Sequence, residues 1–388
     1  MCLAAAADFL GAQSYVHAVL KRLSESEAGM ETVGAPLVLE SFTDVVRSSA
    51  VDVVYITLPV AQRDHWVRVC IEARKHVVGG APSAAAPDAE RLLCWLGGMS
   101  AARLLYLDGT PTAHGGPMMT RVAQLVGDLG RVRHMELCLV GAPGHAGGGV
   151  LGDLGWEAIG KILHLVDFTV PVGVSGRIVS CAQDGSIADF EAHMHFLVEG
   201  VHVTATFDCR YVEAQVMAPK SHMLIITTGG TLEAIEAEEG GGAVQNTVGD
   251  KGLCLRVVRS ALKPLEMIQG AFQALDSATA PSSSFVLASP TIAMEAITTE
   301  EYLSPPSEAS GHALWLHLRE SLTQLGTEGR LLIDSEKGKD WGRKIYLTQL
   351  ILDTLLKSAM TGQGESKDNL VPPLPSSLHC EQLASTVG

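Results

Sequence analysis

The fold is decided by the run Val51-Asp52-Val53-Val54-Tyr55-Ile56-Thr57-Leu58, which ends at Pro59. This nearly continuous apolar and β-branched run predicts a strand that is buried on both faces of a sheet. A helical pattern follows to Ala73, and the short strand pattern of residues 76–78 is stopped by two glycines. The order strand, helix, strand favours parallel pairing through a right-handed crossover.

The same rhythm extends to both sides of this run. Residues 12–23 have the apolar spacing of an amphipathic helix, and residues 36–39 form a short apolar run. Downstream, a helical pattern over residues 88–96 and a strand pattern over residues 103–107 repeat the unit. Because such alternation is typical of parallel α/β sheets, we predict a Rossmann-like domain over residues 1–117.

The pattern changes after Pro117, where a helix, a strand over residues 132–140 and a helix over residues 151–166 are predicted. Four strand-like runs then follow one another with only turns between them, at residues 178–181, 190–198, 201–207 and 223–228. Successive strands favour antiparallel pairing, so we predict an α+β domain with a largely antiparallel open sheet over residues 118–360. The polar segment 361–388 is predicted to be disordered.

Composition limits the function classes. The 388 residues carry 28 basic and 43 acidic side chains, a net charge of -15, which would repel nucleic acid and anionic lipid. No apolar run approaches the roughly 18 to 20 residues that span a bilayer. The eight cysteines are scattered without a C-x-x-C pair, so neither a zinc site nor a disulfide framework is indicated. We expect a cytoplasmic protein whose partner is a small molecule.

Four segments carry a resemblance to a known family. They are the run Asp52 to Pro59 continued by Trp66 and Glu72 to Val78, then Leu129-Gly130-Arg131-Val132-Arg133-His134, Gly147 to Gly155, and Thr228-Gly229-Gly230-Thr231-Leu232. In order and spacing they resemble the glucose-fructose oxidoreductase/inositol dehydrogenase family (Gfo/Idh/MocA). The resemblance implies a two-domain oxidoreductase that uses NAD or NADP and self-associates through its C-terminal sheet.

Two of this family's chemical elements are altered here. The family binds the dinucleotide on a G-x-G-x-x-G turn after its first strand, whereas residues 2–13 already resemble its second strand and following helix. We therefore expect one strand–helix unit to be missing ahead of Met1. The family's catalytic Glu-Lys-Pro triplet corresponds to Gly80-Ala81-Pro82, and the methyl group of Ala81 can neither donate a hydrogen bond nor carry charge. Lys75 lies too far back along the strand to replace the lysine.

The second-domain motif Asp-x-Gly-x-His/Tyr is also altered. Asp153 matches its carboxylate, but Glu157 stands at the histidine or tyrosine position. We name Asp153, Glu157 and His114 as candidate catalytic residues, which could share a proton or bind a cation. The alternative is that the two acidic residues only stabilise the start of a helix through its dipole.

The resemblance leaves a residual cofactor region. Its candidate residues are Leu58, Pro59, Arg63 and Pro82, and Arg63 stands where the family has a histidine. A metal site is not predicted: Glu191, His193 and His195 share one face of a strand, but the polar face of an ordinary sheet has the same pattern.

Three hypotheses remain open from the sequence. The first is a weakly active or non-catalytic relative of NAD(P)-dependent dehydrogenases with an impaired cofactor site. The second is an active sugar, polyol or dihydrodiol dehydrogenase in which His114, Arg63 or Glu157 carries the proton and the missing segment carries the glycine turn. The third is a dimerising or docking module.

Overall fold

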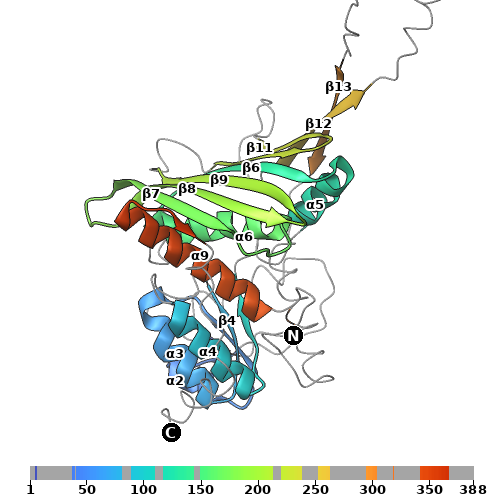
Figure 1. Cartoon of the computed structure of the whole chain (residues 1–388). Coiled ribbons are helices and arrows are strands. Elements are labelled where there is room, and N and C mark those ends of the chain that lie inside the picture. The colour runs from blue at the N-terminus through green and yellow to red at the C-terminus, as the bar shows by residue number, and fades with distance from the viewer. Residues whose placement is uncertain are drawn as a thin grey trace, which may run out of the picture.

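The computed structural model describes a chain of two layers. The described residues are 5–6, 37–39, 41–80, 89–109, 117–143, 149–212, 220–237, 252–262, 294–303, 318 and 341–366. In Figure 1 a large sheet with helices beneath it lies above a smaller unit of strands and helices, and one long helix runs between the two. None of the helices in these ranges is long and apolar enough to cross a membrane.

The smaller unit contains the predicted parallel sheet. Its elements are α2 (Phe42–Arg47), β3 (Val53–Ile56), α3 (Val60–Glu72), β4 (His76–Gly79), α4 (Ala89–Ala101) and β5 (Tyr106–Asp108). The strands pair in parallel in the order β3-β4-β5. Strand β5 begins later than the predicted residue 103, because Arg103 has a φ of 57° and lies in the turn after α4. The strand–helix–strand prediction from residues 51–80 is confirmed.

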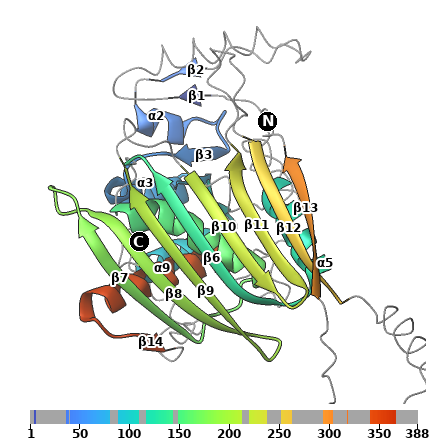
Figure 2. The ribbon, with the colours of Figure 1, turned by 90° about the horizontal axis from the view of Figure 1, so that it is seen from above.

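Two short strands near the N-terminus, β1 (Ala5–Ala6) and β2 (Leu37–Val38), pair in parallel as a separate sheet beside α2. Figure 2 shows them beyond β3. The predicted helix over residues 12–23 lies outside the described residues.

The upper layer is a nine-stranded sheet. Its strands are β6 (Val132–Gly141), β7 (Gly173–Cys181), β8 (Ile187–Val198), β9 (Val201–Tyr211), β10 (Lys220–Thr227), β11 (Gly230–Ala237), β12 (Gly252–Leu262), β13 (Met294–Leu303) and β14 (Glu365–Ser366). They pair in the order β13-β12-β11-β10-β6-β9-β8-β7-β14, visible in Figure 2. Among the described strands of this sheet, β6 and β9 pair in parallel and all other neighbours pair antiparallel. The predicted fold class, a Rossmann-like parallel sheet followed by a largely antiparallel open sheet, is confirmed.

Helices cover the inner face of this sheet. They are α5 (Pro117–Leu129) and α6 (Trp156–Leu165), which follows a π-helical turn, η2 (Leu151–Gly155). Strands β8 and β9 turn Phe190, Phe196 and Phe207 inward, each at most 1% exposed. Helix α6 supplies Ile159 and Ile162 to the same core. The helix predicted over residues 151–166 is therefore present, but its first turn is wider than an α-helical turn.

Helix α9 (Trp341–Thr361) joins the two layers. It packs against β7 and α6 of the upper layer and against α4 and β5 of the smaller unit. The carboxylate of Asp353 accepts a hydrogen bond of 2.7 Å from the backbone N–H of Ala89, the first residue of α4. This contact caps one helix with a side chain from another, 264 positions away in the sequence.

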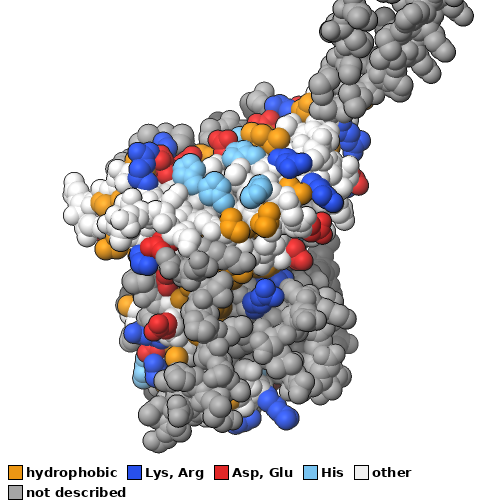
Figure 3. Space-filling view, in the orientation of Figure 1, with side chains coloured by type: hydrophobic (Ala, Val, Ile, Leu, Met, Phe, Trp, Pro, Cys, Tyr) orange, Lys and Arg blue, Asp and Glu red, His pale blue; other side chains and the backbone are white. Residues whose placement is uncertain are grey.

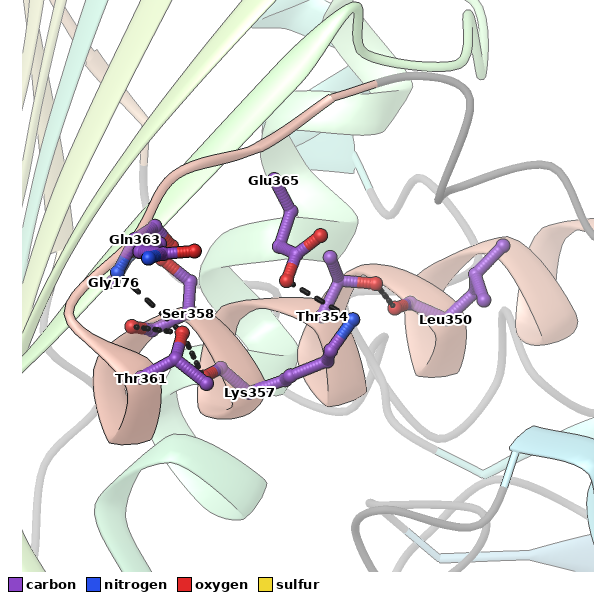
Figure 4. Close-up of polar contacts among 8 residues, drawn as sticks. All are labelled: Gly176, Leu350, Thr354, Lys357, Ser358, Thr361, Gln363 and Glu365. Carbon is purple, nitrogen blue, oxygen red and sulfur yellow. Dashed lines mark hydrogen bonds and ion pairs between the residues drawn. The ribbon is translucent and has the colours of Figure 1, made fainter.

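The end of α9 folds back onto the sheet edge, as Figure 4 shows. Gly176 of β7 donates its backbone N–H to Ser358 Oγ, which in turn donates to the carbonyl of Gln363. Lys357 pairs with Glu365 of β14 at 3.0 Å. Glu365 and Ser366 form the strand β14, and residues 367–388 lie outside the described residues.

Candidate functional site

The carboxyl ends of β3, β4 and β5 form the edge at which ligands bind in parallel α/β sheets. Arg63, on the first turn of α3, lies under this edge with 2% of its side chain exposed. Its Nε donates to the carbonyl of Leu58 at 2.9 Å, and its Nη1 donates to the carbonyl of Gly80 at 2.6 Å. The guanidinium therefore fastens together the segments that follow β3 and β4.

The charge of Arg63 is retained at neutral pH. Burial lowers the pKa of its guanidinium from the ordinary arginine value, while Tyr106, Asp108 and Tyr55 raise it. A guanidinium with so high an ordinary pKa does not act as a proton carrier. The hypothesis that Arg63 carries the proton is therefore not supported by its surroundings.

The other residues singled out from the sequence lie after β3, before β4, or outside the described residues. Leu58 is half-buried and Pro59 is exposed at the start of α3, both directly after β3. Pro82, Ala81 and His114 lie outside the described residues. Lys75 lies at the other end of β4, where its Nζ donates to the carbonyl of Ser48 at 2.9 Å.

A second contact ties this edge to the upper layer. Trp156, the first residue of α6, donates its indole N–H to Oδ2 of Asp108 at 2.8 Å. Both side chains are buried, at 2% and 3% exposure. Asp108 ends β5, so the bond joins a strand end of the smaller unit to the start of α6. Sequence reasoning missed this pair, although an acidic residue directly after a parallel strand is a signal of a site.

Asp153 lies in the π-helical turn before α6, half-buried beside the end of β9. Its Oδ2 accepts a hydrogen bond of 3.2 Å from the hydroxyl of Tyr211, the last residue of β9. Burial raises the pKa of Asp153 from its ordinary value, the Tyr211 hydrogen bond lowers it, and the nearby charge of Glu157 raises it. The sequence predicted Asp153 but did not indicate Tyr211.

Glu157 lies one turn further along the same helical face. Its Oε1 pairs at 2.7 Å with Nζ of Lys161, which is four residues on and only 4% exposed. Nζ also lies 3.5 Å from Oγ of Ser221, at the start of β10. Asp153 thus has a polar partner in Tyr211 and Glu157 has one in Lys161, and the charge of Glu157 still acts on Asp153.

The helix-dipole interpretation also has support, since Glu157 falls in the first turn of α6. It does not account for Lys161, whose buried ammonium group needs a partner of opposite charge. The spacing of Glu157 and Lys161, four residues on a predicted helix, is a sequence signal that could have found this pair.

The outer face of the nine-stranded sheet carries Glu191, His193 and His195, as their alternation predicts. Glu191 pairs with Arg177 of β7. Figure 3 shows histidine and apolar side chains gathered over this sheet. Within the described ranges, no group of three or more histidine, cysteine or acidic residues is arranged to hold a metal ion.

Two further features of the described residues stabilise the edge of the parallel sheet. The predicted cation Arg63 is buried and donates to backbone carbonyls of the protein. At the end of β5, a Cβ on Gly109 would lie 2.9 Å from the carbonyl oxygen of Gly79, so glycine is required there by the packing of the strands themselves.

Comparison with solved structures gives the class of fold. The chain is similar to GenD2 from gentamicin A biosynthesis in complex with NAD, at 14% identity and a TM-score of 0.60, over 94% of this chain and 88% of that one. It is similar to the aldose-aldose oxidoreductase from Caulobacter crescentus, complexed with glycerol, at 15% identity and a TM-score of 0.61, over 94% and 91%. No family model and no curated protein sequence matches the chain.

A third similar structure is a variant of the 3-ketoreductase KijD10 from Actinomadura kijaniata, in complex with TDP-benzene and NADP. Its identity is 14% and its TM-score 0.59, over 92% of this chain and 88% of that one. The chain thus has the fold of Gfo/Idh/MocA-type NAD(P)-binding oxidoreductases, at low sequence identity. The resemblance inferred from the sequence motifs is confirmed at the level of fold.

Proposed function

We propose that this chain is a weakly active or non-catalytic relative of NAD(P)-dependent sugar, polyol or dihydrodiol dehydrogenases, with an impaired cofactor site. The observation that carries the proposal is the placement of Arg63. In the resemblance this position faces the cofactor region, but here the guanidinium is buried and bonded to the carbonyls of Leu58 and Gly80. A buried guanidinium that donates to backbone carbonyls stabilises the fold, and we infer that it does not bind an anionic ligand.

The altered motifs support the same proposal. Ala81 stands at the position of the family lysine, and Glu157, at the position of the proton-transfer residue, forms an ion pair with Lys161. Hydride transfer requires a bound nicotinamide close to the substrate, so weak cofactor binding alone would make turnover slow.

A titration of the purified chain with NADH and NADPH, followed by its melting temperature, tests the proposal. A ligand at about 100 times its dissociation constant stabilises the fold by about 2.7 kcal/mol, so tight binding gives a clear rise. We expect a small rise or none at concentrations up to about 1 mM, because typical enzymes bind such ligands between 1 μM and 1 mM. A saturating rise at micromolar concentration would contradict the proposal and favour an active dehydrogenase.

A second candidate function is self-association through the outer face of the nine-stranded sheet. Two large apolar side chains lie on this face, Leu197 of β8 at 45% exposure and Ile226 of β10 at 37%. An open sheet face with apolar groups favours packing against a second sheet. We propose that the partner is a second copy of this chain.

Light scattering after size exclusion tests this candidate. We expect the chain to have the mass of a dimer and the double variant Leu197→Glu, Ile226→Glu to be monomeric. Met360→Glu is the matched control, since Met360 is 75% exposed on α9 and away from this face. A monomer from the unaltered chain, or a dimer that the double variant leaves intact, would exclude association through this face.

A further inference from the structure

The α6 face carries two carboxylates in unlike surroundings. Asp153 accepts a hydrogen bond from the neutral hydroxyl of Tyr211, whereas Glu157 contacts the ammonium group of Lys161 at 2.7 Å. The residues are four positions apart at the junction of η2 and α6, so their side chains leave the helix on the same side. One carboxylate is thus paired with a cation and the other with a neutral donor.

Lys161 is the unusual member of this group. Its neighbours on α6 are the apolar core residues Ala158, Ile159 and Ile162, each fully buried. An ammonium group in such surroundings is costly unless a carboxylate accompanies it, and here Glu157 and the hydroxyl of Ser221 do so. Glu157 itself is 29% exposed. The ammonium group of Lys161 is therefore buried, whereas the carboxylate of Glu157 is partly exposed to solvent.

We propose that Lys161 is a positioning residue that engages the carboxylate of Glu157 in an ion pair, and so leaves Asp153 as the proton-transfer group of this face. Two carboxylates whose surroundings differ in this way divide the roles of fixed charge and proton carrier between them. In that role the O–H bond of a bound hydroxyl group breaks as an O–H bond forms on a carboxylate oxygen of Asp153. The step moves only a proton and needs no oxidant.

The groups around Asp153 agree with this division. Burial and the charge of Glu157 raise the pKa of Asp153, and Tyr211 lowers it through its hydrogen bond. Strand β9 also turns Cys209 toward this region, but burial raises the pKa of that thiol and keeps it neutral. Among the described residues, Glu157 is the charged group that acts on Asp153, and Glu157 is itself paired with Lys161. The inference rests on the proposed function only for the identity of the hydroxyl-bearing ligand.

A carboxyl titration of the full chain without ligand tests the proposal. Aspartate and glutamate labelled with ¹³C at their side-chain carboxyl carbons are followed by NMR against pH, and Asp153→Asn assigns the resonance of Asp153. We expect one titration step for Asp153. Glu157→Gln removes the neighbouring anion and lowers the midpoint, while Tyr211→Phe removes the hydrogen bond and raises it. Glu191→Gln on the outer face is the control and leaves the midpoint unchanged.

The role of Lys161 is tested by Lys161→Met and Lys161→Arg. Without the cation, the negative charge of Glu157 is no longer balanced, so the midpoint of Asp153 should rise, and Lys161→Arg should restore it. If Lys161→Met does not fold, the Glu157→Gln shift decides, because the division requires Asp153 to sense the charge of Glu157. An Asp153 midpoint that is the same in Glu157→Gln, or a single unshifted step in Lys161→Met, would overturn the proposal.

The NMR titration measures no turnover and is carried out without cofactor. A chain that binds NADH tightly would therefore contradict the proposed function and leave the roles of Asp153 and Lys161 to be decided by the titration. Conversely, an Asp153 midpoint that does not shift in the variants would contradict the positioning role of Lys161 and would leave the proposal of weak cofactor binding unaffected.

Discussion

The role of Arg63 leads to a prediction about stability. Replacing Arg63 with Met keeps much of the side-chain volume but removes two hydrogen bonds, to the carbonyls of Leu58 and Gly80. Hydrogen bonds that involve a charged group contribute about 1.5 to 3 kcal/mol each, so Arg63→Met should lower the free energy of unfolding of the smaller unit by about 3 to 6 kcal/mol. Arg63→Lys should recover only part of this loss, because a lysine lacks the planar fork that reaches two carbonyls.

The matched control lies on the same helix. Arg68 pairs with Asp64 four residues before it, but its side chain is 47% exposed. An exposed pair of this spacing contributes about 0.3 to 0.5 kcal/mol, so Arg68→Met should cost roughly a tenth of Arg63→Met. Urea unfolding followed by tryptophan fluorescence measures both, since Trp66 and Trp95 lie on α3 and α4. Equal stabilities of the two variants would show that Arg63 is not structural and would remove the main support for an impaired cofactor site.

Three further predictions concern the same two layers. Asp353→Ala removes the cap of α4 and should cost about 1 to 2 kcal/mol of unfolding free energy in urea, while Asp353→Asn should retain part of it. Burial lowers the pKa of His76 below its ordinary 6.5, and its Nδ1 accepts from the N–H of Leu105. The unfolded chain therefore binds more protons at His76 than the folded chain does, so the free energy of unfolding should fall as the pH drops through 6.5. In urea unfolding at several pH values, His76→Gln should show a smaller fall. Gly79→Ala would place a Cβ 2.2 Å from the Tyr106 hydroxyl oxygen, so its melting temperature should drop and Tyr106→Phe should partly restore it.

Much of the fold could be predicted because the sequence patterns that indicate its helices and strands lie within short segments. The run over residues 51–58 is nearly continuous in apolar residues, and it forms β3, which pairs in parallel with β4. The predicted burial on both faces is not observed, because β3 lies at one end of the order β3-β4-β5 and Tyr55 is 47% exposed. Gly229 and Gly230 belong to a segment that carries the family resemblance, and in the structure they connect β10 to β11, where Gly230 has a φ of 154° that residues with a side chain rarely adopt. Strands β12 and β13 were not predicted. Their pairing partners and the position of β6 between β10 and β9 depend on contacts between distant segments.

The candidate site was predictable only in part, for the same reason. Asp153 and Glu157 follow from a motif of adjacent residues, whereas Tyr211 lies 58 residues from the carboxylate that it contacts. Trp156 and Asp108 are 48 residues apart and belong to different layers. A residue's type and its neighbours along the chain indicate the chemistry it can perform. Its partner across the fold decides whether that chemistry is used for stability or for function.

The ties between the two layers bear directly on function. The carboxyl edge of the parallel sheet is held by Arg63 from below and by the Trp156–Asp108 bond from α6, while Asp353 of α9 caps α4. In an enzyme of this fold, a group held in place at such an edge increases the reaction rate only if it also contacts the ligand. Here Arg63 donates to backbone carbonyls and Trp156 donates to Asp108, whereas Asp153 and Glu157, which retain partial exposure, lie on the side of α6.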